Sequence, residues 1–244
     1  MEGAKGLVDE GCVWVLRDMG LWLKIKKVPL YVIALVAVGL FIILFAFIVE
    51  GRANRDEDVS GVIPIIDECE VQAEIDGLSW IEQDFLPINP FSRPGIKLET
   101  INGIVIHNIG NPGTTAVQNR NYFANLAETQ ETSVSSNFIV CMDGSIIQCV
   151  PVDEIAYASN ARNIDTLSIE VCHPDDTGKF TDESYASTVR LTAWLCLRFG
   201  LTPSDVIRHY DVQRKECPRY FVVNEDAWTA FLADVAAAMA SAVE

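Results

Sequence analysis

The longest apolar stretch of the chain is residues 28–49, VPLYVIALVAVGLFIILFAFIV, and it contains no charged residue. As a helix it would be about 33 Å long, which is enough to cross a bilayer core of roughly 30 Å. A buried core helix of this length would show a polar face, and a cleaved signal peptide has a shorter apolar core. The pattern therefore predicts a single, uncleaved transmembrane helix.

Charged residues flank this run unevenly. Lys24, Lys26 and Lys27 precede it, whereas Arg52 and Arg55 follow it among several acidic residues. Basic residues near the end of a span favour the cytoplasmic side of the membrane. We therefore expect the N-terminal segment in the cytoplasm, partly as a short interfacial helix, and the C-terminal part outside the cell membrane.

The rest of the chain changes character twice. After the predicted anchor it is polar and acidic, and it then becomes rich in proline, which is typical of an extended segment. Further on, apolar runs of strand length alternate with helical patterns. The predicted organisation is a cytoplasmic segment (1–27), the anchor (28–49), a juxtamembrane linker with an extended arm (50–97) and a compact domain (98–244).

Within residues 98–244 the pattern predicts strands and helices that interleave along the chain. Interleaving of this kind indicates an α/β domain with a mixed central sheet flanked by helices. The sequence Asp143-Gly144 is a turn signal between two of the strands. Strands are expected at 104–107, 137–140, 145–150, 166–172 and 206–209, and helices at 115–126, 182–199 and 225–242.

Charge and cysteine content narrow the possible functions. The formal net charge of −16 falls on the portion after the apolar run, which argues against nucleic acid as a partner. The seven cysteines are an odd number, and their spacing does not suggest a disulfide framework.

The candidate chemistry centres on two histidines at the ends of predicted strands. His107 ends one apolar run, and His209 ends another and begins a polar loop that carries Cys217. Each residue alone would more often be a core histidine or an inert thiol. Zinc takes nitrogen and sulfur ligands, and a catalytic site leaves one of four positions open. The set therefore predicts a zinc site of His107, His209 and Cys217, with His173 as the other candidate histidine.

Two charged residues lie where they could assist a zinc-bound water. Glu170 shares the polar face of its predicted strand with Ser168, and it could accept a proton from the water. Lys215, two residues before Cys217, could stabilise an oxyanion. On local grounds alone, a solvated glutamate and an exposed loop lysine are the more ordinary interpretations.

Five segments carry a family resemblance: IVIHNIGNPGT, SSNFIVCMDGSIIQCVP, IAYASN, NIDTLSIEVCHPDDTGKF and VIRHYDVQRKECP. They resemble the type 2 N-acetylmuramoyl-L-alanine amidases, relatives of the peptidoglycan recognition proteins, over roughly residues 85–235. The resemblance implies a zinc-dependent amidase that cuts the lactyl amide between N-acetylmuramic acid and L-alanine in peptidoglycan. By position, His107, His209 and Cys217 match the metal ligands, and Glu170 and Lys215 match the acidic and basic residues of the site.

The chain also departs from the family pattern. Ser136 stands where some relatives place a tyrosine near the metal. The absence of this tyrosine argues against a tyrosine-assisted mechanism and favours Glu170 and Lys215 as the catalytic groups. His107 is followed by Asn108 rather than by an aromatic residue. Cys217, which recognition-only relatives lack, is present and favours catalysis.

Four further residues are candidates for contact with the substrate: Asn137, Asn160, Arg162 and His173. Two other functions stay open. One is a module that binds peptidoglycan without cutting it. The other is a thiol hydrolase with Cys217 as the nucleophile, although a nucleophilic cysteine needs its base free.

Overall fold

The computed structural model describes residues 12–15, 23–26, 75 and 78–242. The chain divides into two compact units, residues 1–60 and 61–244. Among the described residues, no helix combines the length and the apolar character needed to cross a bilayer. The anchor predicted at residues 28–49 lies outside these residues.

In the first unit, two short strands pair antiparallel, with Cys12 opposite Lys26. They are β1 (Cys12–Val15) and β2 (Leu23–Lys26). The short interfacial helix expected before the apolar run is therefore wrong over these residues. The physical reason is visible in β2, where leucine and isoleucine alternate with lysine at the two-residue period of a strand.

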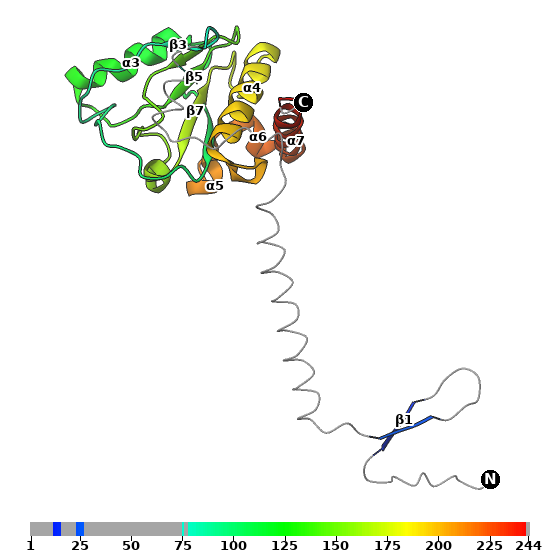
Figure 1. Ribbon diagram of the computed structural model, residues 1–244. Coiled ribbons are helices and arrows are strands. Elements are labelled where there is room, and N and C mark those ends of the chain that lie inside the picture. Colours follow the sequence, from blue (N-terminus) through cyan, green and yellow to red (C-terminus); the bar gives the residue numbers. More distant parts are fainter. Residues whose placement is uncertain (1–11, 16–22, 27–74, 76–77, 243–244) are drawn as a thin grey trace. The chain divides into compact units, whose positions relative to one another are not determined.

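The second unit is built on a six-stranded sheet in the order β3-β6-β5-β7-β4-β8 (Figure 1). β5 and β6 pair antiparallel, and the other neighbours pair parallel, so the predicted mixed central sheet is confirmed. The strands are β3 (Glu82–Gln83), β4 (Ile104–Asn108), β5 (Phe138–Val140), β6 (Ile146–Gln148), β7 (Leu167–Val171) and β8 (Val206–Arg208). The helices are α3 (Ala116–Thr129), η1 (Asn160–Ile164), α4 (Asp182–Phe199), η2 (Pro203–Asp205), α5 (His209–Gln213), α6 (Arg219–Val223) and α7 (Glu225–Ser241).

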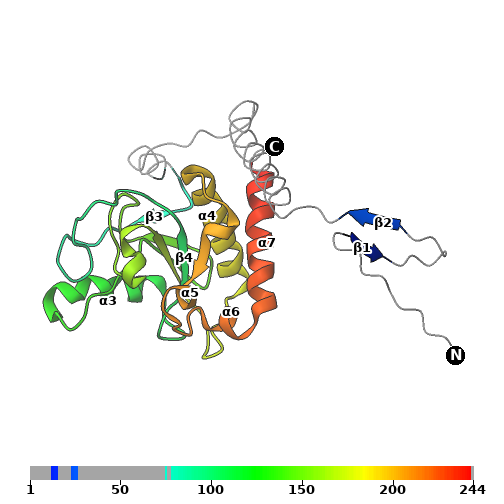
Figure 2. The ribbon, with the colours of Figure 1, turned by 90° about the horizontal axis from the view of Figure 1, so that it is seen from below.

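Helices cover both faces of the sheet, α3 on one side and α4 with α7 on the other (Figures 1 and 2). Alternate residues of each strand point to opposite faces. Ile106 and Ile169 therefore belong to the apolar core beneath α4 and α7, whereas Ile139 and Ile147 belong to the core beneath α3. α3 contacts β5 and β6, so it covers only that half of its face.

Local signals set the ends of the helices α3 and α4. α3 begins at a capping box, in which the Thr115 hydroxyl accepts from Gln118 N and the Gln118 side chain accepts from Thr115 N. α4 begins after Thr181 and ends at Gly200, whose φ of 63° is the left-handed conformation that glycine adopts without strain. Both helices agree with the ranges predicted from the sequence.

The proline-rich arm contributes to the folded unit. β3 extends the sheet by pairing with β6, and Ile75, Ile81 and Leu86 are buried. Trp80 packs edge-on against Trp194 of α4. The arm thus supplies an edge strand and core side chains before the first predicted strand of the domain.

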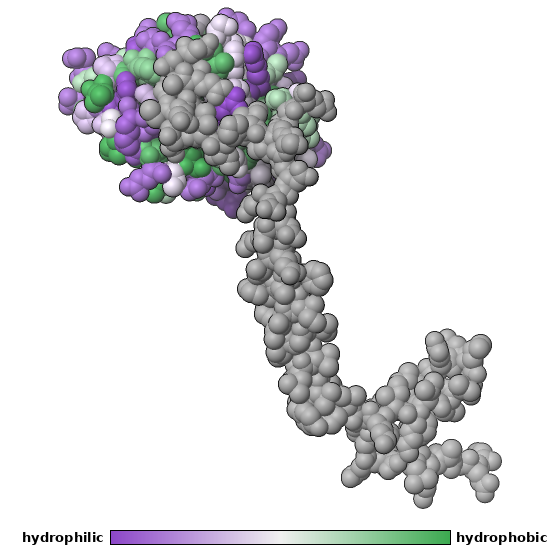
Figure 3. Space-filling view, viewed as in Figure 1, coloured by the Kyte–Doolittle hydropathy of each residue, from purple (hydrophilic) through white to green (hydrophobic). Residues whose placement is uncertain are grey.

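The surface in view in Figure 3 is largely hydrophilic, with scattered hydrophobic patches, as expected for side chains that face water. The five cysteines within residues 78–242, Cys141, Cys149, Cys172, Cys196 and Cys217, are free.

The segment after β8 is more helical than the loop predicted from the sequence. His209 begins the short helix α5, in which the Asp211 carboxylate accepts from the backbone N–H of Arg208 at 2.9 Å. Pro218 immediately precedes α6. A proline restricts only itself and the residue before it, so it does not prevent a helical turn several residues earlier.

Candidate metal centre and groove

Three parallel strands bring the key side chains into one row. Glu170 of β7 lies directly opposite His107 of β4. Ile106 of β4 lies opposite Arg208 of β8, so His209 follows at the level of His107. The carboxyl ends of neighbouring parallel strands are where α/β proteins place their sites. Ile139 of β5 pairs with Glu170, so the row lies on the same face of the sheet as Ile139. α3 covers that face over β5 and β6, whereas the row lies on β7, β4 and β8.

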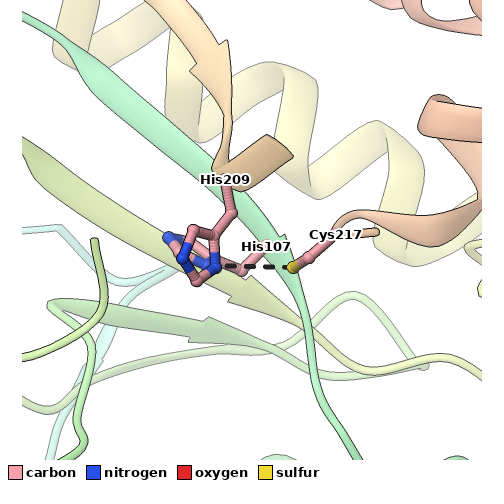
Figure 4. A group of neighbouring side chains, drawn as sticks. All are labelled: His107, His209 and Cys217. Carbon is pink, nitrogen blue, oxygen red and sulfur yellow. Dashed lines mark hydrogen bonds between the residues drawn. The ribbon is translucent and has the colours of Figure 1, made fainter. Parts of the chain in front are cut away.

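Cys217 completes the cluster from the segment after α5. One ligand atom from each of His107, His209 and Cys217 lies within 4.8 Å of the others, and all three residues are buried. The Cys217 Sγ atom is 3.9 Å from His107 Nδ1, and the two imidazole rings have centroids 4.6 Å apart. Figure 4 shows the three side chains converging from three segments.

Asn108 holds the Cys217 segment against β4. Its backbone N–H donates to Cys217 Sγ at 3.4 Å, and its Oδ1 accepts from Arg219 N at 2.7 Å. In the sequence this residue was only a departure from the family pattern. Its position directly after His107 could have suggested a role in the site. Its contact with Cys217, 109 positions away, depends on tertiary packing and could not be read from the sequence.

A buried nitrogen without a partner in the described part of the chain indicates, independently of any family resemblance, that the cluster can hold a zinc ion. His209 Nδ1 is buried and has no hydrogen-bond partner among the described residues. A buried polar atom without a partner calls for an explanation, and an ion at this position would provide one. Two imidazoles and one thiol are the donors that zinc prefers, and three ligands leave a fourth position open.

The surroundings keep both imidazoles neutral, as metal ligation requires. The pKa of His107 is lowered well below 6.5 by burial, by His209 and by Lys215. The pKa of His209 is lowered to about 4 by burial and by Lys215. Burial and the nearby Glu170 raise the pKa of the Cys217 thiol to about 12, so an ion must displace the thiol proton when it binds.

Glu170 lies beside the cluster as an unpaired carboxyl. Its Oε1 is 3.9 Å from His107 Nδ1, and its Oε2 is buried without a hydrogen-bond partner among the described residues. Burial raises its pKa from 4.5 to about 7, although Lys215 acts in the opposite direction. A carboxyl with a pKa near neutrality can both take and return a proton at physiological pH.

A groove of about 500 Å³ adjoins the cluster at Cys217. Glu170 and Cys217 line it, with Tyr122 of α3 on one wall and the exposed Lys215 on another. The groove is the place where an extended substrate can reach Glu170. A second hollow, of about 470 Å³, has a largely apolar lining and lies between α4 and α7, among residues such as Trp194, away from the cluster.

His173 and Asn137 differ in their placement. His173 lines the groove and lies 2.8 Å from Ile109 O through its Nε2. Asn137 is fully buried, and its amide donates to the carbonyl groups of Pro151 and Glu154 while its Oδ1 accepts from Ser168. These hydrogen bonds tie the hairpin to β7 and give no support to the expected contact of Asn137 with substrate, which stays a prediction.

Asn160 and Arg162 both lie on η1, and only Asn160 contacts a histidine of the cluster. Asn160 Oδ1 is 3.3 Å from His209 Nε2. Arg162 forms an ion pair with Asp165 at 2.7 Å, within its own segment. Neither residue lines the groove, so the geometry gives no support to a substrate contact for either.

Ser136 is fully buried, and its hydroxyl donates to Phe138 O at 2.9 Å. Its hydroxyl is bonded to the backbone of the hairpin, and Ser136 does not line the groove. The residues of the site that the sequence did not single out are Ser159 and Gln213, each of which contacts a histidine of the cluster. Gln213 follows His209 by four residues on α5, a spacing that places two side chains on one helix face.

Comparison with known families agrees with this geometry. Residues 97–220 match the family described as N-acetylmuramoyl-L-alanine amidase. The chain belongs to this amidase family. The matched range includes the row across β7, β4 and β8 as well as Cys217.

Two curated members of the amidase family illustrate the similarity. The N-acetylmuramoyl-L-alanine amidase CwlL of Bacillus licheniformis is 30% identical over an alignment of 165 residues, which covers 62% of this chain and 45% of CwlL. The N-acetylmuramoyl-L-alanine amidase BlyA of Bacillus subtilis (strain 168) is 29% identical over an alignment of 184 residues, which covers 66% of this chain and 48% of BlyA. The chain thus spans about half the length of the curated relatives that it matches.

Solved structures show the same fold. The catalytic domain of XlyA is 27% identical, with a TM-score of 0.54, over 62% of this chain and 98% of that domain. A mutant endolysin from Bacillus subtilis is 25% identical, with a TM-score of 0.54, over 62% of this chain and 97% of its own. The aligned part of this chain therefore corresponds to nearly all of each of these structures.

Proposed function

We propose that this chain is a zinc-dependent N-acetylmuramoyl-L-alanine amidase that acts on peptidoglycan. The bond cut would be the lactyl amide between N-acetylmuramic acid and L-alanine. The observation that carries the proposal is the convergence of His107, His209 and Cys217 beside Glu170, next to a groove that Glu170 and Cys217 line. Membership of the amidase family supports the choice of substrate.

His107, His209 and Cys217 would hold the ion, and the groove would orient the peptide stem across it. Bound zinc supplies a Lewis acid and lowers the pKa of a water molecule toward neutrality. Glu170 takes the proton of that water at its carboxylate and returns it to the leaving nitrogen. Its raised pKa of about 7 suits both transfers.

Lys215 contributes a positive charge at the rim of the site. It lines the groove with Glu170 and Cys217, and its charge already lowers the pKa values of both histidines. An ammonium at this place stabilises negative charge that develops on the amide oxygen. Ser136 is buried in the hairpin and takes no part in this chemistry. Glu170 therefore transfers the proton of the water, and Lys215 stabilises the negative charge on the amide oxygen.

The thiol-hydrolase alternative is opposed by the environment of Cys217. A nucleophilic cysteine needs a lowered pKa, whereas burial and Glu170 raise the pKa of this thiol to about 12. A binding module would not need a buried carboxyl that can exchange a proton near neutrality. The observed site favours hydrolysis over both.

We further propose that residues 28–49 anchor the enzyme in the cell membrane, with the amidase domain outside. The uncharged run and the lysines that precede it support this orientation. Protease treatment of intact spheroplasts tests it. Digestion of the amidase domain is expected, and complete protection until lysis would contradict it.

The decisive experiment uses the full chain in a mild detergent, stripped of metal and then loaded with zinc. We expect one zinc per chain and the release of new L-alanine amino termini from purified peptidoglycan, with both lost on chelation. Glu170→Gln should keep its zinc and lose roughly 10²- to 10⁴-fold in turnover. Glu183→Gln, an exposed carboxyl on α4, is the matched control and should retain full activity.

Each other result identifies an alternative. Zinc binding without release of amino termini would indicate a module that only binds peptidoglycan. Release that resists chelation but stops after alkylation would indicate a thiol mechanism. Wild-type turnover in Glu170→Gln would remove Glu170 from its proposed role.

A further inference from the structure

Two consecutive residues, Ser159 and Asn160, contact the Nε2 atoms of His107 and His209. His107 Nε2 lies 3.1 Å from the Ser159 hydroxyl, and the contact is buried. His209 Nε2 lies 3.3 Å from Asn160 Oδ1. One dipeptide, more than 45 residues from either histidine in sequence, therefore contacts the Nε2 atom of both rings.

These contacts leave the same atom of each ring for an ion. His107 Nδ1 is the nitrogen that faces Cys217 Sγ and Glu170 Oε1. His209 Nδ1 is the buried nitrogen without a partner among the described residues. A neutral imidazole carries its proton on one nitrogen and binds a metal through the other. The contacts at Nε2 thus select Nδ1 as the ligand atom in both rings.

The dipeptide is held by its own segment. Asn163 Oδ1 accepts from the backbone N–H groups of Ala158 and Ser159, at 3.1 and 2.5 Å. Arg162 N donates to Ser159 O at 3.0 Å. Asn160 has a φ of 52°, a left-handed conformation that costs free energy in a residue with a side chain. Such conformations persist where the surroundings enforce them, and they cluster at functional sites.

We propose that Ser159 and Asn160 are positioning residues, which accept hydrogen bonds from the Nε2–H groups of His107 and His209 and so direct both Nδ1 atoms toward zinc. The proposal rests on the proposed zinc-amidase function. Partners at the outer nitrogen commonly fix the tautomer and orientation of metal-binding histidines, and their loss weakens metal binding by about 10- to 100-fold.

His209 has a second partner, which affects the design of the test. The amide nitrogen Nε2 of Gln213 lies 2.7 Å from His209 Nε2, and a half-turn of the amide group would put its carbonyl oxygen there as an acceptor for Nε2–H. Loss of Asn160 alone is therefore partly compensated. The informative variants are Ser159→Ala and the double variant Asn160→Gly with Gln213→Ala. Glycine at position 160 removes the side chain and tolerates the positive φ.

The test titrates the metal-free full chain, in mild detergent, with zinc against a chromophoric chelator. Ser159→Ala and the double variant should each raise the zinc Kd by about 10- to 100-fold. Asn160→Asp, which keeps an acceptor oxygen, should bind at least as tightly as the wild type. Gln130→Gly is the matched backbone control, because Gln130 is exposed and has a φ of 54° at the end of α3.

A second readout observes the tautomer directly. The chain has three histidines, so ¹⁵N-histidine labelling gives a spectrum with few signals. In the zinc-loaded wild type, the proton of both ligand histidines should reside on Nε2. Equal thermal unfolding temperatures of the metal-free proteins would show that a weaker Kd does not reflect misfolding.

The outcomes separate this proposal from the function on which it rests. Wild-type zinc affinity in both informative variants, or protons on Nδ1 in the loaded enzyme, would overturn the positioning role and leave the amidase intact. A wild-type protein that binds no zinc would overturn both. A raised Kd in the two variants, with an unchanged Gln130→Gly control, would support the role.

Discussion

Replacing Glu170 by glutamine should stabilise the metal-free protein at high pH. The carboxylate is buried next to His107, and one of its oxygens has no hydrogen-bond partner among the described residues. Burial raises its pKa from 4.5 to about 7. Each pKa unit corresponds to about 1.4 kcal/mol, so ionised Glu170 lowers the stability of the metal-free protein at pH 8 by roughly 3 kcal/mol. Glutamine has nearly the same shape and does not ionise.

The sign of the pH dependence follows from the direction of the shift. The pKa of Glu170 is higher in the folded protein than in the unfolded chain, so the folded protein keeps this proton to higher pH. The contribution of Glu170 to the stability of the wild type therefore falls as the pH rises from about 4.5 to about 7, and the Glu170→Gln variant lacks this contribution. Titration of the histidines is common to both proteins and largely cancels in their difference.

Urea unfolding in the presence of a chelator, at pH 4 and at pH 8, measures the effect. The free-energy difference between variant and wild type should shift in favour of the variant by up to roughly 3 kcal/mol from pH 4 to pH 8. Glu183→Gln, at an exposed position, should show no such change. A difference that is independent of pH, or one that favours the wild type at pH 8, would refute the argument that Glu170 is held at a cost to stability.

The remaining predictions concern the hairpin and the thiols. Asn137→Ala should lower the free energy of unfolding by roughly 2–4 kcal/mol, because the buried amide of Asn137 links the hairpin to β7, and it should leave KM unchanged. A raised KM in a fully folded variant would instead support a contact of Asn137 with substrate. Gly144→Ala should cost about 1–3 kcal/mol in urea unfolding, because Gly144 has a φ of 82° and a Cβ there would lie 3.0 Å from Glu183 O; unchanged stability would show that the turn adapts. Among the five cysteines within residues 78–242, Cys141 should react first with iodoacetamide at pH 8, because the other four are buried; mass spectrometry of peptides measures the order. Faster labelling of Cys217 would contradict the burial and the raised pKa of that thiol.

Sequence reasoning identified the members of the site because their signals are local. His107 and His209 each end an apolar run, and Cys217 follows within a short polar segment. Helix boundaries were equally local, as Gly200 at the end of α4 shows. A strand end, a cap or a turn is encoded by residues a few positions apart, so the pattern along the chain is sufficient to locate it.

Tertiary structure decided which of these residues meet and in what role. The register of three parallel strands places Glu170 opposite His107, and a strand shifted by one residue would turn its side chain to the other face. The same packing buries Asn137, which the sequence had placed at the substrate, and brings Ser159 and Asn160 against the histidines. These contacts join segments 31 to 52 residues apart. They are set by how the sheet and its loops pack, and no spacing within a single segment encodes them.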